Sequence, residues 1–333
     1  MTKDIFTVIS TMKNEGPFVL EWVSHYKSLG FDNILVCTND CEDSTRELLR
    51  ALERKGLVRH HPTRIWPRAG IHRSALKQAL RYDEVKQADW NFVCDVDEFL
   101  NIKIGDGSVR ALVEASGPGA DVIAVPWRNF GPGDVRRFTD RPVTHQFRLA
   151  EHTPATRKEA GKFVKSLFCG LEKYRRVGIH APIPHDDWEG RINTVSPGGV
   201  PTIVDGERVQ PSFEVAQVNH YALRAMETFL VKRARGRANH MSHTLGMQYW
   251  KRFDLNDVPD NSIRRYDASV NGWLSSFMAD PELRSLHEQS VEWYERRITE
   301  LRADPELADL VREIDEFRGV QPRRPALRVV GAA

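Results

Sequence analysis

The chain has 333 residues and a mass of 38.1 kDa, which favours about two domains or one large α/β domain with an appendage. Hydrophobic residues make up 41% and charged residues 28%, and this mixture excludes a disordered or fibrous chain. Basic and acidic residues nearly balance, 48 against 46, so the net charge of +2 argues against a dedicated nucleic-acid binder.

No apolar run approaches the roughly 20 residues that a membrane-spanning helix needs, and the first residues lack the pattern of a signal peptide. The cysteines do not have the paired short spacing of a zinc site, and two stand inside apolar runs where reduced core thiols are expected. They are Cys37, Cys41, Cys94 and Cys169. We therefore expect a protein of the reducing cytoplasm.

The first hundred residues alternate strand and helix signals. Strands are expected over 5–10, 33–37, 57–60 and 90–94, and helices over 16–29, 43–55 and 74–86. This alternation predicts a parallel sheet with helices on both faces. Ligands of such a sheet bind in the crevice at the carboxyl ends of the strands.

The pattern changes after residue 100. A further strand is expected over 121–126, a lid or inserted loop over 136–162, a hairpin turn at 196–199 and a basic helix over 221–238. Two later helices share the start Asp-Pro-Glu-Leu, in which Asp280 and Asp304 act as N-caps. The tail after Arg318 is rich in Pro and Arg and is predicted to be disordered.

Two carboxylates, Asp95 and Asp97, follow the fourth expected strand directly. Carboxylates at the end of a buried strand are costly unless something neutralises them. Mg²⁺ or Mn²⁺ does so and commonly holds phosphate oxygens as well. A solvated turn with an acidic cap is the alternative, but the position after a buried strand favours the metal.

A second cluster surrounds the basic helix. His220 precedes it and is a candidate metal ligand, while Lys232 and Arg235, one turn apart on its polar face, are candidates for holding an anion. A core histidine and a solvated cationic face are the alternative. Asn14 and Asp40 follow the first two strands, where polar groups line a nucleotide crevice but also commonly form caps and turns.

The chain resembles family 2-like glycosyltransferases with a GT-A fold, in the branch similar to glycosyltransferase family 92. The matching motifs run in order through residues 5–236, and the part after about residue 240 carries none. They are 13–15, 21–26, 30–32, 39–40, 95–99, 127–131, Lys162 with 165–166, 178–180, and 219–221 with Lys232 and Gly236.

This resemblance implies a nucleotide-sugar donor, a Mn²⁺ or Mg²⁺ cofactor and a Rossmann-like, doubly wound mixed sheet. By the same resemblance, Asp95, Asp97 and His220 are the expected metal ligands. The expected donor-binding residues are Asn14, Glu15, Asp40, Asp95, Lys232 and Arg235, and the expected sugar and acceptor residues are Trp127, Asn129, Phe130 and His180.

Inverting sugar transfer also needs a carboxylate that takes the proton of the acceptor hydroxyl. Related enzymes place it downstream of the Asp-x-Asp motif, so Asp187 and Asp186 are the candidates here, with Asp134 as a rival. No clear Glu-Asp pair stands in that region, and a doubled Asp before Trp equally fits a helix cap.

Two other classes of protein stay open. Haloacid-dehalogenase-like phosphohydrolases also place Asp-x-Asp after an apolar strand, although usually near the chain start. A non-catalytic scaffold on the same fold is the other.

We expect a metal-dependent inverting glycosyltransferase that transfers sugar to a glycan, glycolipid or polysaccharide acceptor, with no nucleic-acid partner. The basic helix and Arg-rich tail permit peripheral attachment at the inner face of a membrane. The expected domains are a GT-A domain over 1–240, a helical extension over 241–318 and a disordered tail over 319–333.

Overall fold

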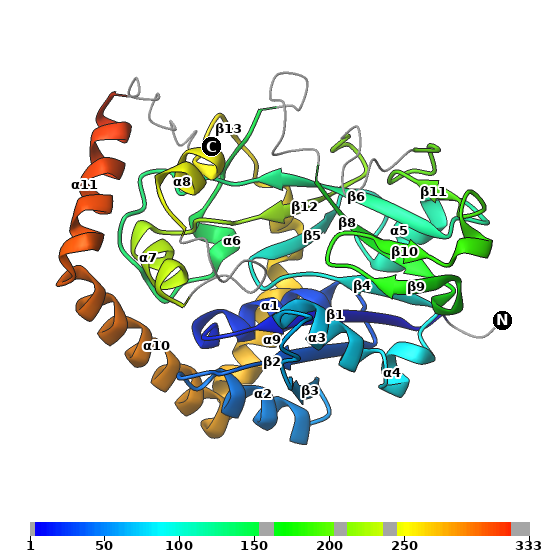
Figure 1. Cartoon of the computed structure of the whole chain (residues 1–333), viewed down its shortest axis with the longest axis horizontal. Helices are drawn as coiled ribbons and strands as arrows, with labels where there is room; N and C mark the ends of the chain where they lie inside the picture. The colour runs from blue at the N-terminus through cyan, green and yellow to red at the C-terminus, as the bar shows by residue number, and fades with distance from the viewer. Residues whose placement is uncertain (1–3, 153–162, 203–211, 236–244, 321–333) are drawn as a thin grey trace.

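The computed structural model describes residues 4–152, 163–202, 212–235 and 245–320. Within these ranges nine strands form one mixed sheet, in the order β3-β2-β1-β4-β8-β6-β12-β5 with the short strand β11 paired to β6 (Figure 1). The strands are β1 (Phe6–Met12), β2 (Asn33–Thr38), β3 (Arg59–Pro62), β4 (Trp90–Val93), β5 (Glu98–Ile102), β6 (Val122–Asn129), β8 (Val164–Cys169), β11 (Thr194–Val195) and β12 (Ala216–His220).

The first four strands in the chain pair in parallel, as the alternation of elements predicted. β8 then enters between β4 and β6 and runs antiparallel to both, which makes the sheet mixed. The expected α/β fold with a doubly wound mixed sheet and a helical C-terminal part is thereby confirmed. Four further short strands form two small two-stranded sheets: β7 (Leu149–Ala150), β9 (Tyr174–Val177), β10 (Pro182–Pro184) and β13 (Val258–Pro259).

Helices cover both faces of the sheet. α1 (Gly16–Ser28) and α2 (Thr45–Arg54) share a core with one face of β1 and β2, and α3 (Ile71–Ala79) packs on the other face. The remaining helices are α4 (Asp83–Lys86), α5 (Val109–Ala115), α6 (Val143–Gln146), α7 (Met226–Ala234), α8 (Met247–Phe253), α9 (Asp267–Ala279), α10 (Pro281–Arg302) and α11 (Pro305–Val320).

Several expected boundaries were wrong. The helix expected over 74–86 is divided into α3 and α4, because Tyr82 adopts an extended backbone and its hydroxyl bonds His61. The helix expected from 221 begins only at Met226, because Arg224 has a left-handed φ of 54°. The third strand lies two residues later than expected. The hairpin turn at 196–199 is confirmed, since Ser196 N–H donates to the Val200 carbonyl.

The C-terminal helices are part of the same core as the sheet. α9 packs on α1, and α10 crosses α1, α2 and α7 along one edge of the molecule (Figure 1). The Asp280 carboxylate accepts hydrogen bonds from two N–H groups of the first turn of α10, which confirms that N-cap. α11 ends at Val320, and residues 321–333 and the boundary expected at 240 lie outside the described residues. Within the described ranges, no helix is both long and apolar enough to cross a membrane.

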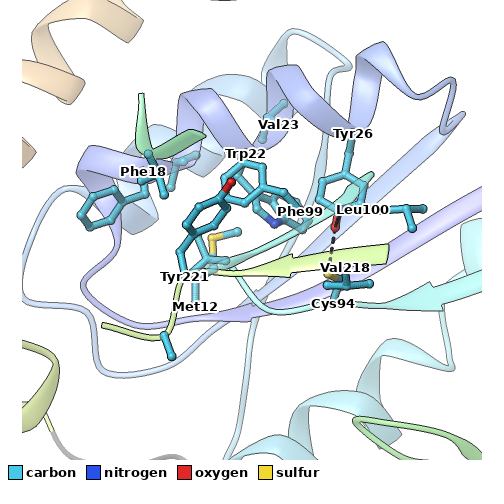
Figure 2. Close-up of a cluster of buried hydrophobic side chains, with 14 of the residues drawn as sticks. Met12, Phe18, Trp22, Val23, Tyr26, Cys94, Phe99, Leu100, Val218 and Tyr221 are labelled. Carbon is cyan, nitrogen blue, oxygen red and sulfur yellow. Dashed lines mark hydrogen bonds between the residues drawn. The ribbon is translucent and has the colours of Figure 1, made fainter. Parts of the chain in front are cut away.

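Helix α1 is buried around most of its circumference, between the sheet and α9 and α10. Figure 2 shows Trp22 and Tyr26 on this helix, and their rings, tilted by 43° to each other, have centroids 4.4 Å apart. The Tyr26 hydroxyl lies 2.8 Å from the Cys94 thiol, and the Trp22 indole N–H donates to the Asp95 carbonyl at 3.1 Å. The core thereby holds the turn that follows β4.

We predict that the buried His25 of helix α1 makes the protein less stable in mild acid. Burial lowers the pKa of His25 to about 4, and its Nε2 bonds the Leu100 carbonyl at 2.8 Å. In the unfolded chain His25 binds a proton below pH ~6.5, whereas in the folded chain it stays neutral down to pH ~4. The free energy of unfolding therefore falls as the pH falls through this window. Urea unfolding at pH 7 and pH 5 should show a smaller loss for His25→Gln than for the wild type. An equal loss in both proteins would contradict this assignment.

Candidate active site

A cavity of about 650 Å³ opens at the carboxyl ends of β1, β2, β4, β6 and β12. This is the edge at which the parallel strands present their following residues, as expected for a doubly wound sheet. It combines a polar floor with an aromatic wall. Its lining residues include Thr11, Lys13, Glu15, Asn39, His72, Asp95, Asp97, Trp127, Phe163, His180, His220, Lys232, Arg235, Tyr249, Arg252 and Phe253.

Asp95 and Asp97 lie on the floor, in the tight turn between β4 and β5. Lys165 Nζ lies 2.8 Å from Asp95 Oδ2, and Lys232 Nζ lies 2.6 Å from Asp97 Oδ2. Burial alone would raise the pKa of both carboxyls, but the neighbouring cations hold both pKa values below their usual range. Both carboxylates are therefore charged at neutral pH.

Beneath the floor lies an ionic cluster with no contact with solvent. Lys165, on β8, also reaches Glu98 Oε2 at 3.0 Å, and both of these side chains are fully buried. Burial raises the pKa of Glu98 to about 8 in spite of Lys165, whereas the two facing carboxyls outweigh burial and raise the pKa of Lys165. Glu98 Oε2 also accepts from the Asp95 N–H at 2.8 Å. Lys165 and Glu98 therefore fix the turn that carries both aspartates.

His220, the last residue of β12, faces Asp97 with its Nε2 4.0 Å from Asp97 Oδ2. Its Nδ1 lies 2.9 Å from Asn129 Oδ1. The Asn129 amide is itself oriented, because its Nδ2 donates to Glu151 Oε1 at 2.9 Å. The amide oxygen must therefore accept from an Nδ1–H of His220. Burial lowers the pKa of His220 to about 3, so the ring is neutral and its Nε2 lone pair points toward Asp97.

Glu15 connects the end of β1 to the turn before α7. Its carboxylate pairs with Arg224 at 3.0 Å and with Arg235, and Arg235 Nη1 also donates to the Lys13 carbonyl at 2.7 Å. Arg224 is buried, its guanidinium stacks on Phe18 at 3.7 Å, and Nη2 donates to the Val96 carbonyl. The left-handed backbone of Arg224 is thus held by tertiary contacts that no local helix signal contains.

Two of the residues expected to contact the nucleoside do not line the cavity. Asn14 is buried, and its Oδ1 accepts from the Glu42 N–H at 2.7 Å. Asp40 is exposed, and its Oδ2 accepts from the neighbouring Asn39 amide. Both have a positive φ, 52° and 44°, so both shape the loops after β1 and β2. Asn39 itself lines the cavity.

Aromatic rings form the opposite wall. Trp127 stacks on His220 with centroids 4.1 Å apart and contacts His180 at 5.2 Å. Burial lowers the pKa of His180 to about 4, and its Nδ1 bonds the Val164 carbonyl. Phe130, by contrast, packs against Tyr221 in the core and does not line the cavity. Asn129 does not line the cavity either; it orients His220 by the hydrogen bond to Nδ1.

The three residues expected as catalytic base lie away from the described cavity wall. Asp186 and Asp187 form the exposed short 3₁₀ helix Asp186–Trp188, where Asp186 pairs with Arg175 at 2.7 Å. Asp134 is fully exposed in the loop after β6, 3.8 Å from Arg318. Their role as base stays a prediction.

Several site residues had no role in the sequence-based account of the site. Lys165 belongs to a matched motif, but its pairing with Asp95 depends on where β8 joins the sheet. Tyr249 and Arg252 come from α8, beyond the last motif, and only the fold brings them to the wall. The motif residues Lys162 and Gly236 lie outside the described residues.

Among the described residues, no group of three or more His, Cys, Asp or Glu side chains is gathered closely enough to hold a metal ion. The donor types do suit one, since two ionised carboxylates and a neutral imidazole nitrogen converge on one part of the floor. These residues therefore have the donor atoms that a metal ion needs, but they are not gathered into a complete coordination site.

Such an α/β sheet, with acidic and cationic side chains at its carboxyl edge, belongs to the class of nucleotide-binding folds. Residues 3–244 match the model of glycosyltransferase family 92. The chain therefore belongs to this family.

A curated relative is a glycosyltransferase family 92 protein of Ricinus communis, 25% identical over 145 residues. The match covers 41% of this chain and only 25% of that protein. Among solved structures, residues 1–349 of TarS of S. aureus are similar over 96% of this chain and 93% of theirs, at 12% identity and a TM-score of 0.32. A putative glucose-1-phosphate thymidylyltransferase of Bacillus anthracis is similar over 74% of this chain and 99% of its own, at 10% identity and a TM-score of 0.35.

Proposed function

We propose that this protein is a metal-dependent, inverting glycosyltransferase, which transfers a sugar from a nucleotide donor to a glycan, glycolipid or polysaccharide acceptor. The observation that carries the metal dependence is the pair His220 and Asp97. Both facing atoms are hydrogen-bond acceptors, so neither satisfies the other. Lys232 donates to Asp97 Oδ2, and a cation held between the two residues would satisfy the His220 Nε2 lone pair and share this carboxylate.

In this proposal Asp97, Asp95 and His220 hold Mn²⁺ or Mg²⁺, and the bound ion supplies charge stabilisation for the diphosphate leaving group. Lys232 and Arg235, at the same part of the cavity, bind diphosphate oxygens. Glu15 and the Lys13 carbonyl hold the Arg235 guanidinium in place for this task. Trp127 and His180 lie where a sugar ring would stack and bond.

Inversion requires that the acceptor hydroxyl attack the anomeric carbon opposite the leaving group while a base takes its proton. Asp187, Asp186 and Asp134 remain the proposed candidates. The configuration of the first-formed product, read by proton NMR, tests this part of the proposal, since a product with the donor's own configuration would contradict it.

Donor binding is tested by thermal melts of the protein with UDP, GDP, CMP or dTDP, each with and without Mn²⁺. We expect one nucleotide to raise the Tm by a few degrees in the presence of Mn²⁺, because ligand at ~100 times its Kd stabilises a fold by roughly 2.7 kcal/mol. The matching nucleoside, which lacks the diphosphate, is the control and should give little shift. An equal shift without Mn²⁺ would contradict metal dependence, and no shift at all would favour the phosphohydrolase or scaffold alternatives.

A further inference from the structure

The loop before α3, α3 itself and the turn that follows it carry charged side chains of one sign. Residues 63–82 contain no Asp or Glu, in a chain whose basic and acidic residues nearly balance overall. The side chains of this basic surface are exposed, and none of them pairs with an acid among the residues that the structure describes. They are Arg64, Arg68, Arg73, Lys77 and Arg81.

Buried polar side chains hold this loop in shape. The Gln78 side-chain amide makes two hydrogen bonds to the backbone of Arg64: it accepts from the N–H at 3.1 Å and donates to the carbonyl at 2.7 Å. Ser74 Oγ accepts from the Trp66 N–H at 2.9 Å and donates to the Gly70 carbonyl at 2.7 Å. Gln78 and Ser74 are both buried. Because these two buried side chains hydrogen-bond the loop backbone, they hold the basic residues of the loop in fixed positions.

The tip of the loop is apolar. Ile65 is 36% exposed, Pro67 is exposed, and the half-buried Trp66 ring lies 5.4 Å from Lys77 Nζ. Soluble polyanions need the cations alone, whereas a bilayer interface takes both cations, for its anionic headgroups, and apolar or aromatic side chains. The combination favours a lipid surface.

The basic surface also adjoins the active site. Ile71 and His72, on the first turn of α3, line the cavity, while Arg73 and Lys77 lie on the exposed side of the same helix. α3 packs on β1, β2 and β9, on the sheet face opposite α1 and α2 (Figure 1).

We propose that the basic surface docks the protein on an anionic lipid bilayer and brings the cavity mouth close to an acceptor carried in that bilayer. The docking itself stands on the charge and the apolar tip, and only the delivery of the acceptor rests on the proposed function. The surface differs from the basic helix and the Arg-rich tail, to which membrane attachment was first ascribed.

The test is co-sedimentation of the full chain with vesicles of phosphatidylcholine alone or mixed with phosphatidylglycerol. The wild type should bind only the mixed vesicles, and less at higher salt. The variant Arg64→Gln/Arg68→Gln/Arg73→Gln should bind roughly a hundredfold more weakly, because each basic side chain near an anionic surface contributes about 1 kcal/mol. The variant Arg46→Gln/Arg50→Gln/Arg296→Gln removes equal charge from exposed positions on α2 and α10 and should bind like the wild type.

Ile65→Ser/Trp66→Ser separates a lipid surface from a soluble polyanion. Weaker vesicle binding with unchanged binding to polyphosphate would support docking on the bilayer. Equal losses in the two triple variants, or tighter binding to polyphosphate than to vesicles, would overturn it. Thermal melts with the donor nucleotide should be unaffected by these changes, because none of the changed residues lines the cavity, so a failure of docking is distinguishable from a failure of the proposed function.

Discussion

Asp97→Asn is expected to lower kcat/KM for sugar transfer by about a thousandfold or more. The amide cannot supply the negative charge that a metal ligand needs, and it also releases Lys232, which lies 2.6 Å from the carboxylate. Losing one preorganised electrostatic group at a reacting diphosphate costs about two to three orders of magnitude, and loss of the metal adds to this. Steady-state release of the donor's nucleotide, measured over a range of Mn²⁺ concentrations, gives the result.

Asp309→Asn is the matched control, because it removes an exposed carboxylate on α11 whose one ion pair within the described ranges is with Arg312, three residues on. It should leave kcat/KM within twofold. An Asp97→Asn protein that keeps more than a tenth of wild-type activity would contradict the proposal that Asp97 is a metal ligand.

Lys165→Met is expected to destabilise the fold by about 3–5 kcal/mol, the typical cost of leaving buried charges unpaired. Lys165 has no solvent exposure and bridges Asp95 at 2.8 Å and Glu98 at 3.0 Å, so both carboxyls lose their cation. Urea unfolding at pH 7 measures the change in free energy. Lys86→Met, which breaks the exposed pair with Asp83, should cost at most about 1 kcal/mol.

The double variant Lys165→Met/Glu98→Gln shows whether the cost comes from this cluster. At pH 7 the buried Glu98 carboxyl, whose pKa is raised to about 8 even beside Lys165, is neutral only because it takes up a proton, and loss of Lys165 raises that cost. Replacing Glu98 with a neutral amide removes this cost, so part of the stability should return. If the two single changes simply add, the buried pair does not exist as described. Because Lys165 also fixes the turn that carries Asp95 and Asp97, we expect its loss to reduce activity as well as stability.

The pattern of elements along the first hundred residues could be predicted with little loss. Strands and helices there have strong periodicity and clear ends, such as the left-handed glycines Gly30 and Gly56. Parallel pairing follows from the alternation itself, and parallel strands bring Glu15, Asn39 and Asp95 to one edge. Part of the floor of the site could therefore be predicted from the sequence alone.

Long-range pairing decided what the local pattern could not. The turn at Arg224 delays the start of the expected helix to Met226, because Glu15 and Phe18, some two hundred residues earlier, hold its guanidinium. No window around Arg224 contains those partners. The exposure of Asp186 and Asp187 likewise depends on how the small β9–β10 sheet sits beside the large one.

By itself the sequence determined the alternation of strands and helices up to β4, the acidic turn after β4 and the Asp280 cap, because each depends on neighbours within a few residues. The tertiary structure alone decided which cation neutralises each carboxylate. β8 enters antiparallel beside β4 and brings Lys165 to Asp95, while α7 brings Lys232 to Asp97. A charge buried in the low-dielectric interior is stable only beside an opposite charge, and the fold decides which one lies beside it. Local sequence periodicity therefore does not predict the pairing.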